Sequence, residues 1–156
     1  MQRRTLVKGI TGQAVLALAV SCEFIRPTWA QITLLNHKKA FDAKSVREAT
    51  LALGSAGLPI LSKEIILTAN DVEESGEKVA IEIQSLIKNT TQIAFLVEKN
   101  PNILAAVFDI PNGTFAHIKL PLKLSQSSTV VALIKAQDKF YYTSKAISVT
   151  IGGCGN

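Results

Sequence analysis

From Ile65 to Ile151, apolar and polar residues alternate in short runs that turn-forming residues separate. Val79, Ile81 and Ile83 are each followed by a small or polar residue, which is typical of a strand with one buried face. The runs cover residues 65–68, 79–83, 93–97, 104–110, 115–124, 130–136 and 140–151. The turns between them include Asn100-Pro101-Asn102, Pro111-Asn112-Gly113 and Gln137-Asp138-Lys139. Strands at this spacing predict an antiparallel β-sandwich of two sheets.

A helical pattern precedes the strands. The run from Lys38 to Leu53 is rich in Ala, Lys, Glu and Leu, and Phe41, Val46 and Ala49 lie on one face if it is helical. Gly54 is placed to end such a helix. The sequence therefore predicts one short N-terminal helix, connected by a linker to whatever lies before residue 38.

The first 30 residues have the layout of an export signal. They combine a positive start, an apolar core too short to span a bilayer, and the small residues Thr28 and Ala30 before an expected cut after Ala30. The pair Arg3-Arg4 resembles the twin-arginine export motif, and a general secretory signal is the alternative. Either route predicts that the mature chain works outside the cytoplasm, with the twin-arginine route leading to the periplasm.

Composition indicates a globular domain and argues against a nucleic-acid ligand. The chain has 156 residues, of which 47% are hydrophobic and 19% are charged, and its formal charge is +5. Removal of residues 1–30 leaves 13 basic and 11 acidic residues, a net charge of +2. A nucleic-acid-binding protein usually has a basic stripe or patch, and the sequence has none.

The cysteines become informative once the signal is removed. Cys22 lies within the signal, although Ala19-Val20-Ser21-Cys22 also loosely resembles a lipoprotein processing site. The mature chain then keeps one thiol, Cys154, which is the third residue from the end of the chain. A single thiol forms no internal disulfide, so it predicts either an intermolecular bond or a reactive role.

The sequence around Cys154 favours a carrier over a catalytic nucleophile. Gly152, Gly153 and Gly155 make a thin, flexible tail, and Gly152 to Asn156 would reach about 17 Å when extended. No Lys, Arg or His lies in this tail to stabilise a thiolate, so we expect a thiol pKa near or above about 8.5. Activation would then come from the active site of a partner. The alternatives are a structural subunit that uses Cys154 for an intermolecular disulfide, and a chance cysteine.

The sequence gives little support for a metal site or a catalytic triad. A blue-copper site needs two histidines, a cysteine and usually a methionine, but His37 and His117 are far from Cys154 in sequence and the sole methionine is Met1. The acidic run between residues 71 and 77 lacks the spacing of a calcium loop. No spacing indicates a catalytic triad. We therefore expect no metal, no cofactor and no catalytic residue of its own, and hence not an enzyme.

Three stretches of the sequence resemble one known family. The C-terminal FYYTSKAISVTIGGCGN, the upstream EKNPNILAAVFDIPNG and the AFDAKSV segment closely resemble SoxY, the sulfur-carrying subunit of the periplasmic thiosulfate-oxidising (Sox) system. The likeness covers nearly the whole chain. Its most specific part is the terminal Gly-Gly-Cys-Gly, and Glu98-Lys99-Asn100-Pro101-Asn102 adds support.

The resemblance implies a fold, a site and partners. The fold would be an immunoglobulin-like β-sandwich, paired in a heterodimer with the small β-protein SoxZ. Cys154 would hold the substrate covalently, and Gly152, Gly153 and Gly155 would form a swinging arm. A c-type cytochrome enzyme would join thiosulfate to the thiol, a dimanganese hydrolase would release sulfate, and in some organisms a molybdenum–haem dehydrogenase would oxidise the remaining sulfur. Family members usually end in Gly-Gly-Cys-Gly-Gly, so Asn156 is a departure that bears on the fit of the arm in partner channels.

The expected organisation is therefore a signal peptide in residues 1–30, a helix and β-sandwich domain in residues 31–151, and a C-terminal arm in residues 152–156. After removal of the signal we expect no membrane attachment.

Overall fold

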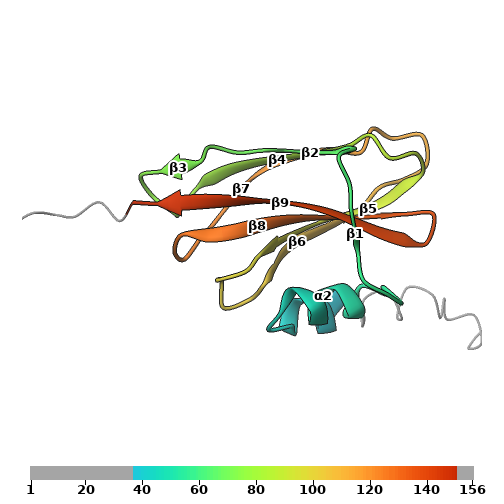
Figure 1. The fold of residues 1–156 in the computed structure, drawn as a ribbon, viewed down its shortest axis with the longest axis horizontal. Helices are drawn as coiled ribbons and strands as arrows, with labels where there is room; N and C mark the ends of the chain where they lie inside the picture. The colour runs from blue at the N-terminus through green and yellow to red at the C-terminus, as the bar shows by residue number, and fades with distance from the viewer. Residues whose placement is uncertain (1–36, 151–156) are drawn as a thin grey trace, which may run out of the picture.

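The structure, a computed structural model, describes residues 37–150 and has two β-sheets with short helices below the larger one (Figure 1). The predicted signal and arm lie outside the described residues. The strands are β1 Ile60–Leu61, β2 Ile65–Thr68, β3 Val72–Glu73, β4 Val79–Ser85, β5 Thr90–Val97, β6 Leu104–Asp109, β7 His117–Leu122, β8 Ser128–Ala136 and β9 Lys139–Val149. The larger sheet has the order β1-β9-β8-β5-β6, with β3 also paired to β9, and the smaller sheet has the order β2-β4-β7. The predicted immunoglobulin-like β-sandwich is confirmed.

The core between the sheets follows from the alternation in the sequence. Val79, Ile81 and Ile83 of β4 are fully buried and face the larger sheet, whose Phe95 on β5 is also fully buried. The residues between them on β4 point to the other face, where Glu82 is partly exposed. Burial of these side chains supplies much of the stability of the sandwich, at about 1.5–3 kcal/mol for each large apolar side chain.

The predicted turn between the last two strands is confirmed. Gln137 and Asp138 both have positive φ angles, 50° and 60°, and connect Ala136 to its direct partner Lys139. Positive φ at both central residues is the requirement of a two-residue type I′ turn, whose twist matches that of the strands. The turn fixes the register of β8 against β9, and hence the position at which β9 ends.

The N-terminal helix differs from the prediction. The single helix expected over residues 38–53 is wrong, because the structure has two helical segments, residues 37–42 and α2 Val46–Ala52. Ser45 starts α2 by accepting a hydrogen bond from the Glu48 backbone N–H (3.1 Å), and the Glu48 carboxylate accepts one from the Lys44 backbone N–H (2.9 Å). This arrangement resembles a capping box, which begins a new helix where the periodicity alone continues the old one.

The helices cover the outer face of the larger sheet. Ala40 and Ala49 are fully buried there against Leu96 and Leu133 of β5 and β8, and small alanine side chains let the helices approach the sheet closely. Strand β5 is consequently buried on both of its faces. Gly54, with a φ of 98°, follows α2 as the sequence predicted.

Two short strands were not predicted. Strand β1 pairs in parallel with β9 at Ile60 and Tyr141, and β3 pairs in parallel with β9 at Val72 and Ser148. Between β1 and β3 the chain crosses to the smaller sheet as β2. Strand β3 therefore lies beside the final residues of β9, near the end of the described part of the chain.

Candidate functional site

The predicted site residues continue from the end of strand β9. Gly152, Gly153, Cys154 and Gly155 lie outside the described residues, and the last described residue is Thr150. Figure 1 shows β9 pointing toward one end of the sandwich, where its arrowhead lies close to β3. The structure thus describes the base from which the predicted arm extends.

We call residues 148–150 the arm base. Strand β3 and the residue before it hold the arm base on one side through hydrogen bonds. The Ser148 backbone N–H donates to the Asp71 carbonyl (2.9 Å), and the Thr150 backbone N–H donates to the Glu73 carbonyl (2.9 Å). The Thr150 hydroxyl donates to the same Glu73 carbonyl (3.3 Å). These bonds order the backbone up to the last described residue.

A serine holds the base on the other side. The Ser127 hydroxyl accepts a hydrogen bond from the Val149 backbone N–H (2.9 Å) and donates to the Val149 carbonyl (3.3 Å). The Ser127 hydroxyl therefore satisfies the backbone N–H and C=O groups of Val149, which β8 does not extend far enough to pair with. Two residues earlier, Ile147 is buried in the core between the sheets.

A close backbone contact lies next to this base. The Leu124 backbone N–H donates to the Gly76 carbonyl (2.7 Å), which joins the β3–β4 connection to the β7–β8 connection. A Cβ atom at position 76 would lie 2.0 Å from the Leu124 carbonyl oxygen and 3.5 Å from Val149 Cγ1. Only glycine permits this approach without a backbone shift.

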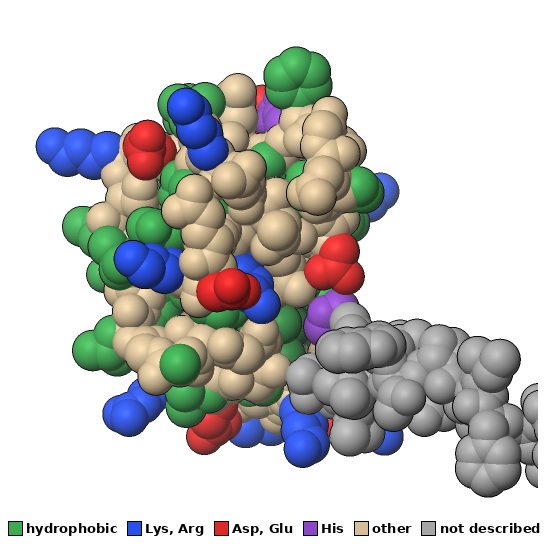
Figure 2. All heavy atoms as spheres, turned by 90° about the vertical axis from the view of Figure 1, so that its right-hand side faces the viewer, with side chains coloured by type: hydrophobic (Ala, Val, Ile, Leu, Met, Phe, Trp, Pro, Cys, Tyr) green, Lys and Arg blue, Asp and Glu red, His purple; other side chains and the backbone are tan. Residues whose placement is uncertain are grey.

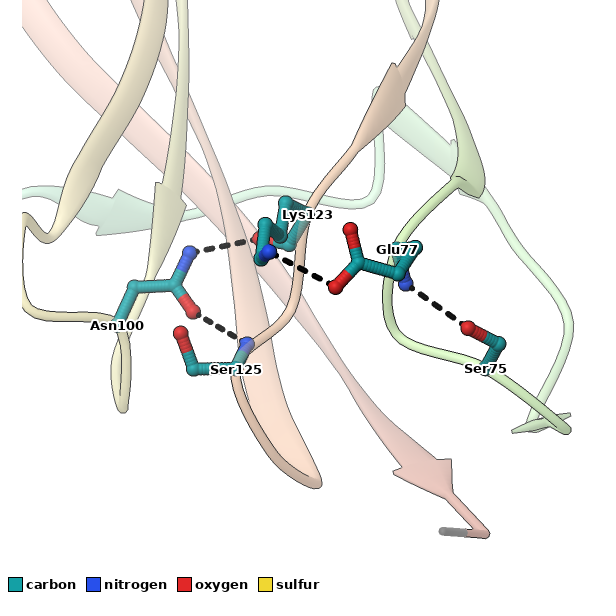
Figure 3. Close-up of polar contacts among 5 residues, drawn as sticks. All are labelled: Ser75, Glu77, Asn100, Lys123 and Ser125. Carbon is teal, nitrogen blue, oxygen red and sulfur yellow. Dashed lines mark hydrogen bonds and ion pairs between the residues drawn. The ribbon is translucent and has the colours of Figure 1, made fainter. Parts of the chain in front are cut away.

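Asn100 fixes the β7–β8 connection from the other side. Its amide nitrogen donates to the Lys123 carbonyl (2.7 Å), and its amide oxygen accepts from the Ser125 backbone N–H (2.9 Å) (Figure 3). The Lys123 ammonium pairs with the Glu77 carboxylate (2.8 Å), as the same figure shows. The motif Glu98–Asn102, which the sequence analysis quoted only as a likeness, thus holds the loop that carries Ser127.

The acidic run beside the base is largely engaged in contacts within the protein. Asp71 pairs with Lys145 (2.9 Å), whose ammonium also donates to the Ala69 carbonyl. Glu73 accepts a hydrogen bond from the Asn70 amide (2.8 Å). Within residues 37–150 no group of three or more His, Cys, Asp or Glu side chains is arranged to hold a metal ion.

His117 lies on the outer face of the smaller sheet, away from the interior. Its Nε2 lies 2.7 Å from Glu82 Oε1 across β4 and β7. The hydrogen bond from His117 is the main cause that holds the pKa of the Glu82 carboxyl below its ordinary value of 4.5, and the nearby Lys119 ammonium, 3.6 Å away, lowers the pKa further. This is a surface ion-pair cluster and brings no other predicted site residue together.

The opposite end of the sandwich carries charges of both signs. Figure 2 views the molecule from that end, and Lys or Arg side chains are interspersed there with Asp and Glu.

Neither helical segment of the described chain has the length and apolar composition that crossing a membrane requires.

The residues that fix the arm base were missed by the sequence analysis. Ser127 lies in the polar loop after β7, and Gly76 lies within the acidic run; both are ordinary loop residues in the sequence. The only signal in the sequence was that Gly76 is flanked by polar residues. This signal does not indicate that Gly76 contacts the backbone of Leu124.

Comparison with known proteins identifies the family. The sequence profile described as "Sulfur oxidation protein SoxY" matches residues 52–154, which is most of the chain and ends at Cys154. The chain belongs to the SoxY family. SoxY proteins act in sulfur oxidation, within the Sox system, and the resemblance seen in the sequence is confirmed.

Two solved structures are similar to this SoxY-family chain. One is the sulfur carrier protein SoxY from Chlorobium limicola f thiosulfatophilum, with a TM-score of 0.60, 24% identity, and coverage of 67% of this chain and 96% of that chain. The other is a superoxide reductase (neelaredoxin) from Ignicoccus hospitalis, with a TM-score of 0.49, 14% identity, and coverage of 67% and 92%. The likeness to the Chlorobium protein shows a shared fold. A search of curated proteins gave no match.

Proposed function

We propose that this SoxY-family chain is a sulfur carrier of thiosulfate oxidation that holds its cargo covalently on Cys154. The observation that carries the proposal is the position of this thiol, on a glycine tail that continues from a firmly held strand end. The hydrogen bonds of Thr150 and Val149 fix where the tail begins. Gly152, Gly153 and Gly155 then give the sulfur atom freedom to move over the distance the tail can span.

The proposed chemistry needs no catalytic group on this chain. In the first step, the Cys154 sulfur and the outer sulfur of thiosulfate form a disulfide bond, giving Cys–S–S–SO₃⁻. The thiol proton is released, and two electrons pass to a c-type cytochrome partner. In the second step, water attacks the sulfonate sulfur and breaks its bond to the neighbouring sulfane sulfur, which releases sulfate and leaves a persulfide on Cys154. A partner hydrolase with a dinuclear manganese site would catalyse this step, and a molybdenum–haem dehydrogenase would consume the persulfide where it is present.

The proposal includes a location and a permanent partner. The chain would be exported to the periplasm by the twin-arginine route, after which residues 1–30 are removed. It would pair with a SoxZ-like β-sandwich subunit to form the working heterodimer. Export as a folded protein suits this fold, because its stability depends on a buried core.

Intact-mass spectrometry tests the covalent step. The mature chain is incubated with thiosulfate and the cognate cytochrome enzyme, and we expect a species heavier by one thiosulfonate group. Cys154→Ser should give no such species. Treatment of the adduct with the hydrolase should convert it to a persulfide, with release of one sulfate.

A displaced thiol serves as the matched control. In the double variant Cys154→Ser/Gln126→Cys, the thiol lies on the β7–β8 loop at the same end of the sandwich but has no arm. We expect ordinary labelling of this thiol by a small reagent and no enzymatic adduct. Adducts that persist in Cys154→Ser would refute the carrier site, and a stoichiometric disulfide dimer that never exchanges would favour the structural role instead.

A further inference from the structure

An Asn-Gly pair lies at the tip of the connection between β6 and β7. Asn112 and Gly113 are both exposed, and the sequence contains no other Asn-Gly pair. Strand β6 ends at Asp109, which pairs with β5 near the point where β5 begins beside the β8–β9 turn. The pair therefore lies at the end of the sandwich opposite to the arm base.

The backbone forms a tight turn at this pair. The Thr114 backbone N–H donates to the Pro111 carbonyl (3.1 Å), and Gly113 has a φ angle of 81°. A positive φ at the third of four residues is the requirement of a type II turn, and glycine adopts it without steric cost. The hydrogen bond of such a turn joins its first and last residues, and so it does not involve the peptide group between Asn112 and Gly113.

The surroundings of the pair leave both of its reactive groups accessible. Within residues 37–150, the Gly113 backbone N–H and the Asn112 side-chain amide have no hydrogen-bond partner. A Cβ atom built on Gly113 would meet no atom within 4 Å, so the space next to the backbone is open. The Gly113 nitrogen and the Asn112 Cγ atom can therefore approach each other by rotation within Asn112.

This approach permits a reaction within the chain, and two groups held in one molecule react much faster than separate molecules do. The Gly113 nitrogen loses its proton to hydroxide and attacks Cγ of Asn112. A five-membered imide ring closes, the bond from Cγ to Nδ2 breaks, and Nδ2 leaves as ammonia. Water then opens the ring at one of its two carbonyl carbons, and no electrons pass to or from another molecule.

The other asparagines of the described chain are in less reactive settings. Asn100 precedes a proline, which has no N–H, and both ends of its side-chain amide are hydrogen-bonded. Asn70 donates its amide to the Glu73 carboxylate (2.8 Å). Asn89 and Asn102 each precede a β-branched residue, whose side chain crowds the nitrogen that would attack.

We propose that Asn112 is a self-modifying site, at which the amide is converted to aspartate and isoaspartate through an imide with Gly113. The reaction consumes water and releases ammonia. The proposal does not depend on the carrier role proposed for Cys154. Each conversion replaces a neutral amide by a carboxylate, so the chain without residues 1–30 would have 12 acidic residues in place of 11 and a net charge of +1 in place of +2.

The modification changes one end of the molecule and leaves the rest intact. Isoaspartate adds one methylene group to the main chain, so the Thr114 N–H and the Pro111 carbonyl no longer close the same turn. Strands β6 and β7 keep their register because they pair with β5 and β4. Asn112 also lines a hollow of about 470 Å³ between the β4–β5 and β6–β7 connections, which gains a negative charge.

Peptide mapping by mass spectrometry tests the proposal on the chain from residue 31 onward. After incubation at neutral and mildly alkaline pH, the peptide that contains Asn112 should show the mass change of an amide that has become an acid. Isoaspartate should be the larger product, and the rate should rise in proportion to the hydroxide concentration. Asn102 is exposed in the same chain and serves as the internal control, with a rate about tenfold lower or less.

Two variants test the roles of the two residues. Gly113→Ala should slow the conversion about tenfold or more, since the methyl group crowds the attacking nitrogen. Asn112→Gln keeps an exposed amide but would have to close a six-membered ring, so it should remain unmodified. Ion-exchange chromatography should then separate the incubated parent into forms of different charge and show a single form of Asn112→Gln. Thermal unfolding checks that both variants are folded.

An unmodified Asn112 after this incubation would overturn the inference, and so would equal rates at Asn112 and Asn102. Aspartate without isoaspartate would also overturn it, because direct hydrolysis of the side chain needs no contribution from Gly113. A Gly113→Ala variant that reacts as fast as the parent would have the same meaning. None of these outcomes changes the expected adduct on Cys154, so the two proposals fail or hold separately.

Discussion

Gly76 and Leu124 meet backbone to backbone beside the base of the predicted arm, and the contact leaves no room for a side chain. We expect Gly76→Ala to lower the free energy of unfolding by about 1–3 kcal/mol, because the two connections must move apart to admit the methyl group. Urea denaturation in the Cys154→Ser background measures the change. Gly57→Ala is the control, because its Cβ would meet no atom within 4 Å and should change stability by no more than about 0.5 kcal/mol.

Glu82 gives a second test on single residues. Its carboxyl pKa is lowered mainly by the hydrogen bond from His117, so the ionised carboxylate favours the folded state. This contribution is present above the ordinary pKa of 4.5 and is lost as the pH falls through the lowered folded-state value. We expect His117→Gln to raise the Glu82 pKa, as an NMR pH titration would show, and to weaken the dependence of stability on pH in that acidic range. An unchanged Glu82 pKa in the variant would contradict this account.

At the scale of elements, the β8–β9 hairpin determines where β9 ends. Gln137 and Asp138 adopt positive φ angles that Asn and Gly adopt more readily. The double variant Gln137→Asn/Asp138→Gly should therefore raise the free energy of unfolding by roughly 0.5–1 kcal/mol, measured by thermal or urea unfolding. A loss of stability would show that the two native side chains make contributions beyond the turn geometry.

The elements also show what the sequence could predict. Alternation predicted the long strands because β4 and β5 bury every second side chain between two sheets. It did not predict β1 and β3, because each has two residues, mostly exposed, and forms only through its pairing with β9. The break before α2 was missed because capping by Ser45 is a local bond that competes with a helical periodicity otherwise continuous in the sequence.

The candidate site was predictable only in part. The tail could be recognised from its composition, since Gly152, Gly153 and Cys154 stand out directly in the sequence. Its anchoring could not, because Ser127 and Asn100 act on backbone groups brought near by the fold, at sequence distances of 22 and 25 residues. Side-chain identity alone does not specify such contacts.

The whole molecule divides, in our proposal, into an anchored body and a delivering tail. Deletion of Gly152 and Gly153 would shorten the reach of Cys154 by about 7 Å. We expect enzymatic adduct formation to fall at least tenfold, with no change in unfolding temperature, since the stability resides in the sandwich. The rate of Cys154 labelling by a small thiol reagent should stay the same, which separates reach from reactivity. A full rate of adduct formation in the shortened chain would contradict a role for tail length.

Pairing along most of β9 has a mechanical consequence. β9 is bonded to β8 over most of its length and to β3 at its final residues, so a pull on the chain end along the strand direction loads many hydrogen bonds together. Load applied in this way acts as shear, whereas a strand held at one edge only would peel away bond by bond. If the tail is held by a larger enzyme, a force on the tail would therefore not detach β9 from the sheet.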